Sequence, residues 1–253
     1  MSSPTASEHE NHAPTETEPL LGRPGDALQK PDAPLIHNLW LGTGWIAQVG
    51  GLLLLGVVWA AVFTHPLLPL VSPHPLLQSF GIFMLLQAIL VLQPTYTPET
   101  KLHGQRAHAS FHLFSFLLFA AGITIIEVNK GTNSMAHFHS VHAYLGVITG
   151  AVLLVQYIFG FLMWGVPGVF GGVEKAKALW KYHRYSGYLL LVLVLATVTS
   201  ATKTDYSKGV LDIKTWSVLI ADALILIGVL PRIQLAKLGI QRPAATATTA
   251  LQG

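Results

Sequence analysis

Apolar residues in this chain gather into long runs that are separated by shorter polar segments. A helix needs about 20 apolar residues to cross the hydrocarbon core of a bilayer. Six runs reach or approach that length, at residues 39–63, 76–94, 109–128, 143–165, 185–202 and 216–231. The last run is the weakest, because it is short and contains Asp222. The pattern predicts an all-α membrane protein with six transmembrane helices.

Composition supports a lipid environment. The chain of 253 residues is 51% hydrophobic and 11% charged, with a mean hydropathy of +0.51, whereas about 25% of the residues in a soluble domain are charged. It contains no cysteine, which excludes disulfides, thiolate-bound metals, iron–sulfur clusters and thiol nucleophiles. The expected partner of such a surface is a lipid bilayer, and no nucleic-acid partner is indicated.

Polar segments flank the predicted membrane domain of residues 37–232. Residues 1–36 are rich in Pro, Ser, Thr and Glu and lack a basic segment before an apolar core, so we predict a disordered tail there and no cleaved signal peptide. Residues 233–253 form the predicted C-terminal tail. Glu16 to Leu21 fits an acidic dileucine sorting pattern, which favours a vacuolar or other endomembrane location, with the plasma membrane as the alternative.

Basic residues predict the orientation of the six helices. Positive residues concentrate on the cytosolic side of membrane proteins. If both termini are cytosolic, the outer segments hold four of the 15 Lys and Arg residues, namely Lys130, Lys203, Lys208 and Lys214. The other eleven are cytosolic, and the first outer loop has none. Both termini are therefore predicted to face the cytosol.

Four of the 12 histidines recur at the starts of successive apolar runs, at His74, His108, His142 and His183. Because alternate helices run in opposite directions, His74 and His142 should lie near the outer face, and His108 and His183 near the inner face. Ionisable residues in membrane helices normally face the bundle interior. Two facing imidazoles are axial ligands for a haem iron. Two such pairs across about 30 Å of hydrocarbon predict an electron relay.

Other side chains could complete these sites. Gly146 and Gly187 each follow a histidine by four residues and lie on the same helix face, which leaves room for a flat macrocycle; close helix packing is the alternative explanation. Arg106 and Arg184 adjoin the inner histidines and could bind haem propionates.

Residues near the two faces could also bind the electron donor and acceptor. At the inner face, the basic residues include Lys101 and Lys181, which could attract an anionic donor or simply meet anionic lipid. His137 and His139 could take part in an outer acceptor or metal site, or be solvated interfacial side chains. His112, one turn after His108, could replace it as ligand or hydrogen-bond a haem substituent.

The combined motifs resemble the cytochrome b561 family of transmembrane ascorbate-dependent oxidoreductases, and fungal stand-alone members in particular. The resemblance covers roughly residues 40–232, and the matching motifs are His74-Pro-Leu-Leu, Arg106-Ala-His108-Ala, Ser140-Val-His142-Ala-Tyr-Leu-Gly146 and Tyr182-His183-Arg-Tyr-Ser-Gly187.

The resemblance implies two b-type haems in a four-helix core made of spans two to five. Spans two and four would bind the non-cytosolic haem, and spans three and five the cytosolic one. It also implies that cytosolic ascorbate or a related reductone donates electrons, and that monodehydroascorbate or a ferric chelate accepts them on the other side. No catalytic side chain beyond these haem and donor residues is predicted. Spans one and six carry no candidate ligand and could supply the surface for a homodimer.

Three other interpretations remain at this point. A histidine-lined metal-ion transporter would use some of the same residue types, but it usually adds acidic, Met or Cys ligands near the midplane. Other di-haem membrane proteins place two histidines about 13 or 14 residues apart on one helix, and no such pair occurs among the four histidines here. A membrane scaffold without ligands leaves the matched histidines unexplained.

Overall fold

The computed structural model describes residues 27–30, 32–133 and 137–239. Within these ranges every regular element is helical, and six helices are long and apolar enough to cross a membrane. The bounds of these helices are α1 Gly44–Phe63, α2 Pro73–Leu92, α3 Pro98–Thr132, α4 Val141–Gly165, α5 Val173–Ala201 and α6 Thr215–Val229. The predicted all-α, six-span architecture is therefore confirmed.

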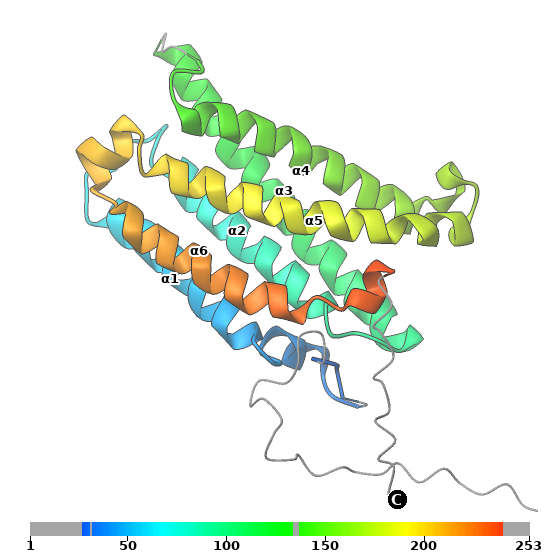
Figure 1. The fold of residues 1–253 in the computed structure, drawn as a ribbon. Helices are drawn as coiled ribbons and strands as arrows, with labels where there is room; N and C mark the ends of the chain where they lie inside the picture. The colour runs from blue at the N-terminus through cyan, green and yellow to red at the C-terminus, as the bar shows by residue number, and fades with distance from the viewer. Residues whose placement is uncertain (1–26, 31, 134–136, 240–253) are drawn as a thin grey trace, which may run out of the picture.

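The six helices form a bundle of three antiparallel pairs (Figure 1). Helix α2 packs most extensively on α3, α1 packs on α6, and α4 packs on α5, while α1 also contacts α2. The α4–α5 pair touches α3 and α6 only lightly. We call the end of the bundle where α1 begins and α6 ends the terminal end, and the other the opposite end.

Two helices extend well beyond their apolar runs. Helix α3 begins at Pro98 and α5 at Val173, so His108 and His183 lie about ten residues inside their helices rather than at the first turn. The start of α3 is stabilised by a capping box in which Thr97 and Thr100 exchange hydrogen bonds. Such polar helix starts are not visible in a hydropathy pattern, which explains the shorter prediction.

Described residues on both sides of the predicted membrane domain, residues 37–232, also pack on the bundle. Before residue 37, Gln29 is buried, its backbone N–H donates to the carbonyl of Pro94, and its side chain accepts from Asn38 at 3.0 Å. After residue 232, the short 3₁₀ helix η5 (Leu235–Leu238) lies against α5. The predicted dileucine pattern lies outside the described residues.

Arg232 ties these terminal segments to the helices. Its side chain is 2% exposed, and Nη2 donates to the carbonyl oxygens of Asn38 and, at 3.1 Å, Leu90. Arg232 ends a short 3₁₀ helix, η4 (Leu230–Arg232), that follows α6. The backbone that continues from Arg232 is thereby directed toward the space between α2 and α5.

Candidate haem-binding sites

The four sequence-predicted histidines meet as two pairs at opposite ends of the bundle. His74 on α2 and His142 on α4 have ring centres 6.3 Å apart, and His108 on α3 and His183 on α5 have ring centres 6.5 Å apart. The first pair lies at the opposite end and the second toward the terminal end, because α2 and α4 begin where α3 and α5 end. This is the pairing that helix direction predicted.

The separation within each pair fits a metal ion held between two imidazoles. A metal–nitrogen bond of about 2 Å on each side, plus roughly 1 Å from each nitrogen to its ring centre, places the ring centres roughly 6 Å apart. Direct edge-to-face contact of two imidazoles is closer, as shown by His108 and His112, whose centres lie 4.3 Å apart. Both histidine pairs therefore have room for an iron between them.

Backbone carbonyl groups orient three of these four histidines. The Nδ1 atom lies 2.9 Å from the Gly122 oxygen in His74, 2.8 Å from the Ala88 oxygen in His108 and 3.0 Å from the Thr197 oxygen in His142. Since a carbonyl oxygen only accepts, Nδ1 must carry the proton, and Nε2 keeps its lone pair for a metal.

His183 is held differently. Its Nδ1 is buried and has no hydrogen-bond partner in the structure. Its ring packs over Gly160 of α4, where an added Cβ would lie 2.9 Å from His183 Cε1. Its backbone oxygen accepts from Gln156 Nε2 at 2.7 Å. The ring position is therefore set by the bare backbone of Gly160 and by the α4–α5 contact.

A cavity of about 500 Å³ opens between the helices at the terminal end. His108 and His183 line it, together with Gly187, Arg184, and apolar side chains such as Trp164. A mostly apolar cavity of this size with a few polar groups is typical of a small-molecule or cofactor site. The residues present fit a haem, since the cavity brings two axial ligands together with an Arg for a propionate.

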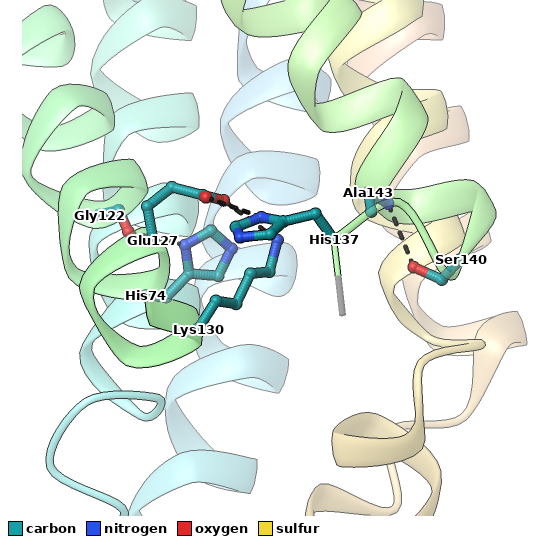
Figure 2. Close-up of polar contacts among 7 residues, drawn as sticks. All are labelled: His74, Gly122, Glu127, Lys130, His137, Ser140 and Ala143. Atoms are coloured by element: carbon teal, nitrogen blue, oxygen red, sulfur yellow. Dashed lines mark hydrogen bonds and ion pairs between the residues drawn. The ribbon is translucent and has the colours of Figure 1, made fainter. Parts of the chain in front are cut away.

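The opposite end carries a second, smaller cavity of about 320 Å³ beside His142. It is lined by His139, His142, Ser200 and Lys203, among others. The side chain of Ser140 caps the start of α4 by accepting from the Ala143 N–H (Figure 2). His139 is thus placed beside the candidate ligand His142, at the mouth of the bundle.

His137 belongs to an ion-pair network at the same end. Glu127 accepts from Lys130 at 3.0 Å and lies 3.2 Å from His137 Nδ1 (Figure 2). Figure 2 also shows His74 and its Gly122 partner at this end. Because His137 faces a carboxylate while His139 lines the cavity, the two predicted acceptor histidines occupy different surroundings.

The predicted supporting residues separate into two groups. The terminal-end cavity is lined by Lys101, Arg184 and Gly187. Arg106 and Lys181 do not line it. The Lys181 ammonium instead lies over the ring of Tyr182. At the opposite end, a Cβ on Gly146 would meet nothing within 4 Å. Open space at Gly146 is compatible with the predicted approach of a macrocycle.

His112, the alternative ligand candidate, and Asp222, the acidic residue of the last apolar run, have distinct environments. His112 lines the terminal-end cavity, and its ring lies against His108 and Tyr157 while its Nδ1 is unpaired. Asp222 on α6 is buried and accepts from the hydroxyl of Thr199 at 2.6 Å. His112 is therefore placed to contact a cavity occupant, and Asp222 instead links α6 to α5.

Sequence analysis missed one basic residue at the terminal-end cavity. Lys237 lines it from the short helix η5, which follows α6 in the predicted C-terminal tail. The only available signal was its short distance after Arg232, which does not identify a binding residue without the fold.

The chain is similar to known proteins over this core. Residues 73–207, more than half of the chain, match the model of the eukaryotic cytochrome b561 family. The lysosomal membrane ascorbate-dependent ferrireductase of Rattus norvegicus is 28% identical over 130 residues, which are 50% of each chain. Ascorbate-specific transmembrane electron transporter 2 of Zea mays is 29% identical over 126 residues, 49% of this chain and 51% of the relative.

A third relative is the transmembrane ascorbate-dependent reductase of Bos taurus, which is 22% identical over 159 residues, 63% of this chain and 58% of the relative. The chain thus spans about half the length of the first of these relatives and somewhat more of the third. The matched segment runs from α2 to just beyond α5 and contains all four paired histidines. The chain belongs to the eukaryotic cytochrome b561 family.

Proposed function

We propose that this protein moves electrons across a membrane, from ascorbate or a related reductone at the terminal end to an acceptor at the opposite end. Two b-type haems would be held by His108 and His183 and by His74 and His142. The acceptor would be monodehydroascorbate or a ferric chelate. The observation that carries the proposal is the presence of two facing histidine pairs, 6.5 and 6.3 Å between ring centres, at opposite ends of one bundle.

The chemistry supplied by two such groups is reversible one-electron transfer at iron. His108 with His183, and His74 with His142, would each supply two imidazoles to such a group, which would favour electron transfer over oxygen chemistry. The chain's own contribution is to hold the ring nitrogens in place. Hydrogen bonds to the carbonyls of Gly122, Ala88 and Thr197 fix the Nδ1–H form of three ligands and increase the basicity of Nε2.

Charged residues at the terminal end would guide the donor. Lys101 and Arg184 line the cavity from α3 and α5. Cationic residues beside an apolar cavity raise the local concentration of an anion such as a reductone. The apolar lining, which includes Trp164 and Trp180, would keep water from the site. Loss of one electron from the ascorbate monoanion to give monodehydroascorbate also releases one proton, which would pass to the solvent at this end.

Orientation and location form part of the same proposal. The distribution of basic residues supports a cytosolic terminal end, where reductants are available. The rat relative is named for the lysosomal membrane, and we propose a vacuolar or other endomembrane location here, with the plasma membrane as the alternative. The opposite-end cavity beside His142, with Lys203 and His139, would then receive the acceptor.

A histidine-lined metal transporter is less compatible with this arrangement. Among the described residues, no group of three or more His, Asp or Glu side chains is placed to hold a metal ion. Protein sites for zinc usually provide three or four ligands. The pairs instead provide two ligands each, which is the number that a haem iron needs beyond its macrocycle.

The experiment that tests the proposal is the haem content of the purified full-length protein, measured by pyridine haemochrome, with spectra before and after addition of ascorbate. We expect two b-type haems per chain and reduction by ascorbate. Protein expressed with adequate haem that contains none would contradict the proposal. Two haems that ascorbate leaves oxidised, but dithionite reduces, would retain the relay and reject the donor.

A further inference from the structure

The segment that follows α6 forms part of the wall of the terminal-end cavity. Ile233, Gln234, Lys237 and Leu238 line it together with His108 and His183. This segment, residues 233–239, lies outside the part of the chain that matches the family model. We call it the C-terminal strap. Its contribution to the cavity was therefore not contained in the motifs of the four-helix core.

Hydrogen bonds join the strap to α5 and to the connection between α2 and α3. Arg184 Nη1 on α5 donates to the Lys237 carbonyl at 2.8 Å, and Tyr185 Oη donates to the Leu238 carbonyl at 3.4 Å. Lys237 Nζ also donates to two carbonyls that follow α2, those of Gln93, at 2.8 Å, and Thr95. The strap thus joins α5 to the α2–α3 connection at the cavity mouth.

Three cations meet at this mouth without an anion. Lys101 from α3, Arg184 from α5 and Lys237 from the strap all line the same cavity. Among the described residues, none of the three forms an ion pair with a carboxylate. Toward the end of α2, Lys237 Nζ donates to the backbone carbonyls of Gln93 and Thr95, which carry no net charge. A cluster of partly buried like charges is unfavourable unless an anion binds there.

We infer that Lys237 is an anion-binding residue that completes the terminal-end site, and that it binds a carboxylate or enolate oxygen together with Arg184 and Lys101. The inference rests on the proposed function, which it deepens by naming a residue and the charge of its ligand. Two sources could supply that oxygen: a propionate of the haem, or the free reductone donor.

The electrostatic state of Lys237 supports this assignment. Burial, followed by the charges of Arg184 and Lys101, lowers the pKa of Lys237 to about 7 from its usual 10.5. An anion bound among the three cations would reverse the last two effects and return the pKa toward its usual value. An anionic ligand would therefore offset the repulsion among the three cations.

The test compares Lys237→Met, which keeps the apolar stem, with Lys237→Arg, which keeps the charge, in the full-length holoprotein. Lys177→Met is the matched control, because Lys177 is a lysine near the start of α5 that pairs with Glu174 and does not line the cavity. Tyr185→Phe controls for loosening of the strap, since it removes one strap hydrogen bond without a change in charge.

Two measurements distinguish the two sources of the anion. One is a dithionite redox titration of both haems, and the other is the KM for ascorbate. If Lys237 binds a propionate, Lys237→Met lowers the midpoint potential of one haem, because loss of a nearby positive charge favours the ferric state. If it binds the donor, the potentials hold and KM rises about tenfold. Lys237→Arg should restore either property.

Equal potentials and equal KM in Lys237→Met and Lys177→Met would overturn the inference, as would a Tyr185→Phe variant that reproduces the full effect of Lys237→Met. Failure of the proposed function gives a separate result. If the wild type binds haem but is not reduced by ascorbate, the donor is wrong, and the dithionite titration still decides whether Lys237 acts on the haem. If the wild type binds no haem, the proposed function fails before any variant is compared.

Discussion

The imidazole of His74 on α2 faces that of His142 on α4 with 6.3 Å between ring centres; a carbonyl of α3 orients the first ring and a carbonyl of α5 the second. The two side chains come from hairpins that otherwise touch lightly. Under the proposed function the two rings would share one ligand.

The number of haems lost in histidine variants should depend on which of the two histidine pairs is altered. If each pair holds one haem, His74→Ala and His142→Ala each lower the content from two haems to about one, and the double variant loses no more than either single variant. The His74→Ala/His108→Ala variant should lose both, because it removes one ligand from each site. Pyridine haemochrome on detergent-purified protein measures this. Equal loss in the within-pair and cross-pair doubles would contradict the assignment.

Gly160→Ala should disturb the terminal-end pair. The added Cβ would lie 2.9 Å from His183 Cε1, so the ring has to move away from its place opposite His108. We expect a lower occupancy or a change toward a high-spin spectrum at that site, with the other haem unaffected. The matched control is Gly56→Ala on α1, where a Cβ meets nothing within 4 Å. Unchanged low-spin spectra in Gly160→Ala would contradict this geometry.

His112 should be dispensable for haem binding but not for haem properties. Its ring lines the cavity against His108, while His108 Nδ1 is the one that a carbonyl oxygen orients. His112→Leu is expected to retain two haems and to shift the midpoint potential or absorption maximum of one of them. Loss of one haem in His112→Leu, with retention in His108→Leu, would exchange the roles of the two residues.

If Lys237 binds the donor and not a haem propionate, capture of the donor should weaken as pH rises through about 7. Lys237 has a pKa lowered to about 7 by burial and by Arg184 and Lys101, so its positive charge is lost above that pH and the attraction for an anion falls. We expect the KM for ascorbate to rise between about pH 6 and 8 in the wild type and to change less in Lys237→Arg, since Arg stays charged.

The same group predicts the opposite trend for stability. Between about pH 7 and 10.5 the unfolded chain holds a proton on Lys237 that the folded chain has lost. Stability therefore rises with pH across that window, because the unfolded state binds more protons there. Thermal unfolding of the donor-free protein should show a Tm that increases from pH 7 to 9, and Lys237→Met should lack this contribution. A Tm increase of equal size in the variant would assign the effect to another group.

Hydropathy and histidine spacing were sufficient to predict the six spans and the two pairs, because both depend on which residues face lipid and on helix direction. The ligand orientation was not predictable. The groups that accept from His74, His108 and His142 are backbone oxygens, and every residue has one. The full length of α3 was also hidden, since its first turns are polar and depend on the Thr97 cap.

Lys237 shows a further limit of sequence analysis. A lysine in a polar C-terminal segment is indistinguishable from a solvated one until the chain is folded. The position of Lys237 depends on the direction of the strap. That direction depends on the burial of Arg232 against Asn38 and Leu90, which is a property of the folded chain. Charge in the sequence thus predicted a basic face, but not which of its members belong to the site.

The light contact of the α4–α5 hairpin with α3 and α6 has a consequence for how the protein is made. If the macrocycles fill the space between the hairpins, they supply much of the contact that holds α4 and α5 to the rest. Maturation would then have an order: the helices would insert first, and binding of the cofactors would afterwards hold α4 and α5 against the other helices. A cell short of iron would accumulate a loosely assembled chain, which membrane quality control could recognise and remove before it reaches its destination.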